Sequence, residues 1–239
     1  MKPLIAESHS SLPETPCASH LLTFDVEHWY EGFRYRGLDG WQDYPPRDDK
    51  MVDRLLDKLG ETGQRSTMFF TGRYAEGFPH VVRRAAQEGH EIASHSYSHT
   101  VLSRLKNIDE FREDLLRSVA ILEDISGCKV KGYRAPKWSI SEKNRHEVLS
   151  VLVEAGFEYD SSVFPKLFGH AEKAVPHKIT LAGGATIWEI PASTYAFFGL
   201  HVPVAGGLYF RLFPQWFNWL ALSSKSSADH PGMIYLHPY

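Results

Sequence analysis

Along most of the chain, short apolar runs alternate with stretches in which apolar residues recur at helical spacing. The runs predict strands, and the spaced stretches, several of which stop at a glycine, predict helices. The expected strands cover residues 21–24, 66–70, 90–94, 130–134, 157–159, 186–191 and 233–236. The expected helices cover residues 49–59, 78–88, 108–126 and 141–155. This alternation, with about seven strands, is typical of parallel α/β folds and barrels.

Two regions do not follow this alternation. Residues 166–184 mix glycine, proline, histidine and lysine without a clear period, so a long loop is expected there. Residues 208–222 are rich in aromatic side chains and are expected to pack as a buried helix that bends at Pro214. Because few charges accompany those rings, contact with a membrane surface is the alternative for this segment.

Composition favours a single globular domain. The chain has 239 residues, of which 43% are hydrophobic, so it can bury the core of one barrel-sized domain, expected at residues 20–239. A net charge of -3 gives no basic surface for nucleic acid, and no apolar run reaches the 18 residues expected of a transmembrane helix. Residues 1–19 form an expected polar tail without the features of a signal peptide, which favours a cytoplasmic location. Cys17 and Cys128 are expected to be free thiols.

Two pairs of potential metal ligands each follow an expected strand. His95 and His99 come after the strand at 90–94, and imidazoles four residues apart share one face of a helical turn. Asp25 and Glu27 follow the strand at 21–24, and residues two apart on an extended chain point the same way. Two histidines and one carboxylate can hold one divalent cation, and the second carboxylate can then serve as a base.

Five ordered segments resemble the motifs of a known family. They are Thr-Phe-Asp at 23–25, His-Ser-Tyr-Ser-His at 95–99, Arg-Ala-Pro at 134–136, Tyr-Asp-Ser-Ser at 159–162 and Leu-His-Pro at 236–238. Together they are similar to the polysaccharide deacetylases, also called the NodB-homology family or carbohydrate esterase family four. Residues 25–30 and 203–214 further resemble the branch associated with exosortase (PEP-CTERM) exopolysaccharide loci.

The resemblance implies a distorted (β/α) barrel of about seven strands. It also implies hydrolytic removal of acetyl groups from N-acetylated sugars, with one divalent metal ion that is usually zinc. By this likeness Asp25 is the general base, His95 and His99 bind the metal, Arg134 orients the base, and His237 is the general acid.

The sequence departs from the family pattern at the third metal ligand. The commoner motif is Thr-Phe-Asp-Asp-Gly, in which the second Asp binds metal, whereas Val26 stands at that position here. Glu27 is the natural substitute because it points the same way as Asp25 and is one methylene longer than Asp. The reverse assignment, with Asp25 on the metal and Glu27 as the base, stays open.

Three further residues are candidates for substrate binding. Trp138 is expected to stack on a sugar ring or else to pack in the core. Pro136 is expected to stiffen the loop that follows Arg134, and Tyr30 to line a glycan groove or simply to pack.

The expected function is therefore N-deacetylation in a bacterial exopolysaccharide or its precursor. The substrate would be an N-acetylated glycan or a lipid-linked sugar at the inner membrane face. The alternatives are an amidohydrolase of a small cyclic amide or imide and an inactive glycan-binding relative. The chain ends at Tyr239, soon after the last expected strand, so the domain is expected to be short at its C-terminus and either less stable or paired with a second copy.

Overall fold

The computed structural model describes residues 20–44, 47–164, 175–197, 200–223 and 231–238. The expected tail at 1–19 and Cys17 lie outside the described residues, as does the stretch 165–174 of the expected long loop. Cys128 is an exposed free thiol, as expected. None of the helices in the described ranges is both long and apolar enough to cross a membrane.

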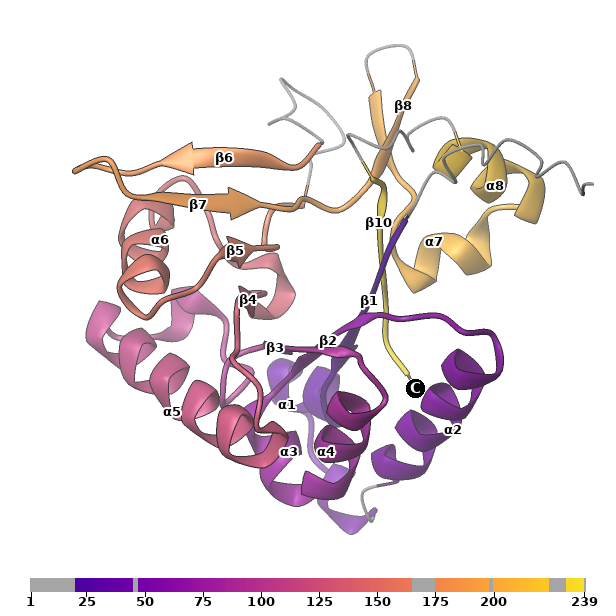
Figure 1. The fold of residues 1–239 in the computed structure, drawn as a ribbon, viewed down its shortest axis with the longest axis horizontal. Helices are drawn as coiled ribbons and strands as arrows, with labels where there is room; N and C mark the ends of the chain where they lie inside the picture. The colour runs from indigo at the N-terminus through magenta and orange to yellow at the C-terminus, as the bar shows by residue number, and fades with distance from the viewer. Residues whose placement is uncertain (1–19, 45–46, 165–174, 198–199, 224–230, 239) are drawn as a thin grey trace, which may run out of the picture.

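Eight of the described strands form one curled sheet in the order β10-β1-β2-β3-β4-β5-β7-β6 (Figure 1). Seven of them are parallel, as the sequence predicts, and β6 pairs antiparallel with β7 at one edge. No ladder among the described strands joins the edge strands β10 and β6, so the barrel is open. The strands are β1 Leu21–Val26, β2 Thr67–Phe70, β3 Glu91–Ser94, β4 Gly132–Tyr133, β5 Tyr159–Asp160, β6 His177–Thr180, β7 Thr186–Glu189 and β10 Met233–Leu236.

The four predicted helices are confirmed: α2 Asp48–Glu61, α4 Pro79–Gln87, α5 Ile108–Ser126 and α6 Arg145–Glu154. Helix α5 has a cap at its N-terminal end, which was not predicted, and the expected glycine at its C-terminal end. The Asn107 side chain accepts a hydrogen bond from the Glu110 amide at 2.9 Å, and Gly127 ends the helix with φ 67°. Two short helices, α1 Glu31–Arg36 and α3 Gly72–Gly77, were not predicted, nor were the 3-10 turns at Trp41–Asp43, Leu102–Arg104 and Pro136–Trp138.

The pleat of β1 separates an apolar face from a polar one. Phe24 and Val26 are buried in the main hydrophobic core, which fills the space between the sheet and its helices. Thr23 and Asp25 alternate with them and reach the buried Arg134 inside the curl of the sheet. The sequence therefore places a charged pair in the interior of the barrel, and the carboxyl end of β1 opens onto the candidate site.

The structure corrects two expectations in the last third of the chain. Residues 177–180 of the expected long loop form β6, and a two-stranded sheet of β8 Thr194–Phe197 and β9 Leu200–Pro203 was not predicted. The expected bent helix at 208–222 is two helices, α7 Gly207–Leu212 and α8 Gln215–Ser223, separated at Pro214. It is not buried, since Trp216 and Trp219 are 68% and 71% exposed. Aromatic content alone misled the prediction, because these two rings face solvent rather than the core.

Candidate metal centre and active site

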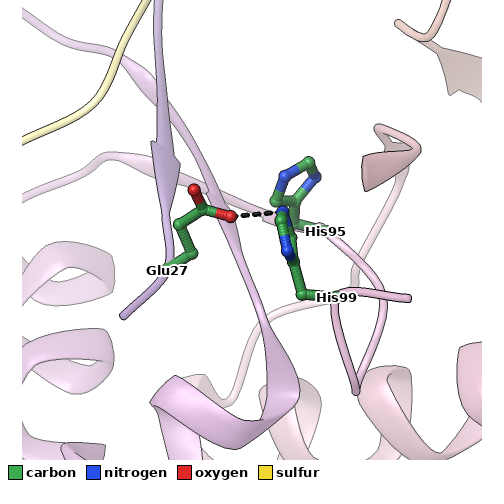
Figure 2. Close-up of side chains that lie close together, drawn as sticks. All are labelled: Glu27, His95 and His99. Carbon is green, nitrogen blue, oxygen red and sulfur yellow. Dashed lines mark ion pairs between the residues drawn. The ribbon is translucent and has the colours of Figure 1, made fainter. Parts of the chain in front are cut away.

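Three potential metal ligands meet at the carboxyl ends of β1 and β3. Glu27 follows β1, and His95 and His99 follow β3. One ligand atom from each residue lies within 4.8 Å of the other two, and all three side chains are buried. In Figure 2 the Glu27 carboxylate points at the His99 ring, with which it forms an ion pair through Nε2. The structure thus brings together the three residues that were predicted to hold a metal ion.

The histidines reach this site from a loop and not from a helical turn, so that part of the prediction was wrong. Ser96 and His99 have φ values of 65° and 54°, which a helix excludes. The Ser96 hydroxyl accepts a hydrogen bond from the His99 amide at 2.9 Å. Asp114 on α5 accepts from the amides of Tyr97 and Ser98 at 2.7 and 3.0 Å. Sequence reasoning missed Asp114, because nothing in the helical pattern of 108–126 distinguishes it from a surface residue.

The surroundings of the two rings suit them as metal ligands. His95 Nδ1 donates to the Arg134 carbonyl at 2.8 Å, which leaves the lone pair of Nε2 available for a cation. Burial lowers the pKa of His95 to about 4, so the ring is neutral at physiological pH. His99 Nδ1 lies 3.7 Å from a carboxylate oxygen of Glu31, whose pKa is raised by burial. Two imidazoles and one carboxylate are a common ligand set for a catalytic zinc ion, so the residues present fit the metal.

The second carboxylate at the site, Asp25, is held by an arginine. Arg134 Nη1 donates to Asp25 Oδ1 at 2.6 Å, and both side chains are buried. Arg134 also donates to the Thr23 hydroxyl at 3.0 Å and, through Nε and Nη2, to the carbonyl and hydroxyl oxygens of Ser161. Burial alone would raise the pKa of Asp25, but the charge and hydrogen bond of Arg134, together with the nearby His95 and His237, outweigh burial and leave that pKa below its usual value. Asp25 is therefore ionised and fixed in direction.

His237 stands at the entrance of the site. It follows β10, the neighbour of β1, and its Nε2 lies 3.7 Å from Glu27 Oε1. Its side chain is 32% exposed, whereas those of Asp25, Glu27, His95 and His99 are almost fully enclosed. A group in this position can reach both the metal ligands and a substrate that arrives from solvent.

Two of the three predicted substrate-binding residues share one turn, and the third lies on another loop. The Trp138 ring packs edge-on against that of Tyr235, with the ring centroids 4.9 Å apart. The guanidinium carbon of Arg134 lies 5.1 Å from the centroid of the Trp138 ring. Pro136 is buried at the start of the same turn, in which Trp138 has φ 55°. Tyr30 lies on another loop, where its ring stacks on that of Trp41 with the centroids 4.3 Å apart.

The protein is thus an α/β fold with a candidate hydrolytic centre at the ends of its strands. The centre consists of two histidines and a carboxylate, next to an aspartate that an arginine holds in place. A family model described as polysaccharide deacetylase matches residues 14–159, more than half of the chain. The chain belongs to this family. A second model, a domain of unknown function (DUF3473), matches residues 161–239.

Similar proteins agree with this assignment. A peptidoglycan-N-acetylglucosamine deacetylase of Bacillus cereus is 38% identical over 95 residues, which are 40% of this chain and 34% of that protein. A chitooligosaccharide deacetylase of Sinorhizobium fredii is 33% identical over 102 residues, covering 43% of this chain and 46% of that protein. The matched segments thus span between a third and a half of these curated relatives. A crystal structure from Mycobacterium smegmatis, assigned to the polysaccharide deacetylases, superposes with TM-score 0.65 at 25% identity and covers 99% of this chain and 82% of that one.

Proposed function

We propose that the protein is a metal-dependent hydrolase that removes N-acetyl groups from an N-acetylated sugar. The observation that carries the proposal is the cluster of Glu27, His95 and His99 next to an aspartate that Arg134 holds ionised. A cluster of this kind suits the hydrolysis of an unactivated amide, which needs a nucleophilic water, an electrophile at the carbonyl oxygen and a proton for the departing amine.

Each residue then has a distinct task. Glu27, His95 and His99 would hold one divalent ion, for which zinc is our proposal, and the bound ion would lower the pKa of water and polarise the amide carbonyl. Asp25 accepts the proton of the attacking water, and Arg134 aims its carboxylate. His237 gives a proton to the departing amine.

The substrate class follows from the relatives and from the surroundings of the site. The relatives named above act on peptidoglycan and chitooligosaccharide, which supports an N-acetylated amino sugar as the group recognised here. Trp138, beside Arg134, would contribute an aromatic wall for the sugar ring. We propose a bacterial exopolysaccharide or its lipid-linked precursor as the polymer, acted on at the inner face of the membrane.

Metal content and acetate release, measured on three proteins, test this proposal. The proteins are the wild type, Glu27→Ala and Asp25→Ala, and the substrate is a series of N-acetylglucosamine oligomers. We expect zinc in the wild type and in Asp25→Ala, little zinc in Glu27→Ala, and acetate release by the wild type alone. Zinc retained by Glu27→Ala and lost from Asp25→Ala would reverse the two assignments. A zinc-loaded wild type that binds the oligomers without releasing acetate would identify an inactive glycan-binding protein.

A further inference from the structure

A buried pair of carboxyl groups lies outside the candidate metal centre. Asp160 ends β5, and its partner in the parallel ladder on β7 is Glu189. Both side chains are inaccessible to solvent. Asp160 Oδ2 and Glu189 Oε2 are each buried without a hydrogen-bond donor in the described part of the chain. Two uncompensated carboxylates at this depth would be very costly, so the pair needs a physical explanation.

The other oxygen of each carboxyl group already accepts a hydrogen bond. Asp160 Oδ1 accepts from the Ser162 hydroxyl, and Glu189 Oε1 accepts from the Val163 amide at 3.1 Å. The two carboxyl groups are direct neighbours across the ladder and interact electrostatically. Since an ionised carboxylate has no donor, a proton on one of the two groups would supply the donor that the remaining oxygens lack.

We propose that Asp160 and Glu189 share one proton and that the protonated pair positions Arg134, and through it Asp25. Burial raises the pKa of Asp160 to about 6, and burial together with the neighbouring Asp160 raises the pKa of Glu189 well above its usual value. At neutral pH the pair therefore keeps a proton that the unfolded chain has lost.

The connection to Arg134 runs through the loop that follows β5. Its residues 162 and 163 donate to the carboxyl pair, and the Ser162 hydroxyl also accepts from the Ala135 amide at 2.8 Å. On the other side of the same loop, Ser161 accepts from Arg134 Nε at 3.1 Å through its carbonyl and from Nη2 at 2.9 Å through its hydroxyl. The pair thus fixes the loop that in turn fixes the guanidinium. Its effect on turnover rests on the proposed function, whereas the shared proton does not.

In the described part of the chain, three further titratable groups lie on elements next to the pair. Tyr133 on β4 and Arg145 on α6 interact electrostatically with Asp160, and His177 on β6 stands opposite Glu189 in the antiparallel ladder. The pKa of Tyr133 is raised well above its usual value by burial, so this phenol stays neutral in the physiological range. A pH effect that comes from His177 can be separated with a His177→Gln variant.

Amide variants distinguish a shared proton from two independent carboxylates. In Glu189→Gln the side-chain oxygen can still accept from Val163, and the NH2 group can donate to Asp160 as the proton does. Asp160→Asn makes the mirror-image replacement. In the double variant both oxygens are needed by Ser162 and Val163, so two NH2 groups must face each other. Glu158→Gln, on the exposed side of the same segment, is the control.

Urea unfolding of the full chain from pH 5 to pH 8 reads out the proton. We expect each single amide variant to unfold at a urea midpoint at or above that of the wild type, with a difference that grows as the pH rises, and the double variant to unfold well below both. The wild type should lose stability with rising pH because the folded pair still binds a proton at pH values where the unfolded chain has released it. This window lies between the pKa values of the two carboxyl groups in the unfolded chain and their raised pKa values in the folded protein. Singles that lose stability equally at every pH, with an additive double variant, would overturn the shared proton.

Kinetics test the positioning role. Glu189→Ala leaves Asp160 and the Val163 amide without their partner, and we expect kcat for acetate release to fall by about tenfold or more with KM and zinc content nearly unchanged. Glu189→Gln is the conservative variant that should restore kcat. Unchanged kcat in Glu189→Ala would overturn the positioning role. If the wild type itself released no acetate, the proposed function would fail, and the urea series would still decide the proton.

Discussion

Replacing Arg134 with methionine tests how much the buried ion pair contributes to stability. The substitution keeps most of the aliphatic stem and removes the guanidinium, whose carbon lies 3.9 Å from the centroid of the Phe69 ring. It removes the 2.6 Å bond to Asp25 and leaves that carboxylate buried without its cation. Removing one partner of a buried pair costs about 3–5 kcal/mol. With a urea m-value of roughly 2–3 kcal/mol per M for a domain of this size, the midpoint should fall by about 1–2.5 M.

Matched variants make this prediction specific. The Arg112–Glu154 pair is 38% and 57% exposed, so Arg112→Met should cost less than about 1 kcal/mol. Adding Asp25→Asn to Arg134→Met should recover part of the loss, because the uncompensated charge is then gone. All unfolding is measured with a chelator present, since bound metal would add its own stabilisation. Equal losses for Arg134→Met and Arg112→Met would refute the argument that burial makes this pair important.

Two further predictions concern residues that shape the site and the sheet. Asp114→Ala removes the acceptor for two backbone amides of the loop that carries both histidines. Zinc affinity, measured by chelator competition, should fall by about 10–100-fold. Unchanged affinity would contradict the role of Asp114 in positioning this loop. Gly132→Ala places a methyl group against the Tyr159 ring and should lower the free energy of unfolding, measured in urea, by about 1–3 kcal/mol. The control is Gly60→Ala at the exposed end of α2, where the added methyl group meets no other atom and should raise that free energy by about 0.5–1 kcal/mol. Equal effects of the two substitutions would show that the Tyr159 contact is unimportant.

The sequence predicts most of the sheet because its signals are local. Apolar runs and terminal glycines located the seven parallel strands and four helices with errors of a few residues, and for α5 both ends agree with the prediction. The sequence did not show β6, whose 177–180 segment lacks an apolar run and pairs only at the edge of the sheet. It also misjudged Trp216 and Trp219, because hydrophobicity says which residues prefer burial and not which ones find a partner.

Within the site, residues that belong to a local sequence motif were predicted, whereas residues whose role depends on contacts between distant segments were not. The spacing of His95 and His99 pointed to the metal cluster, although the loop geometry that presents them depends on Asp114, 15 residues beyond His99. Glu189 was expected only to lie within a strand. Its role as a partner of Asp160 depends on which strands are neighbours, and neither residue's local pattern contains that information.

The pleat of β1 accounts for a proposed third ligand at position 27. Val26 is still within the ladder, where it pairs with Phe70, and its side chain is completely buried in the core between sheet and helices. A carboxylate at position 26 in this strand would therefore point into that core and away from His95 and His99. Since alternate residues share a face, the next position from which a carboxylate can join Asp25 on the inner side is 27. The departure from the commoner family motif therefore goes with a strand that continues through Val26, whose pleat directs residue 27 and not residue 26 to the inner side.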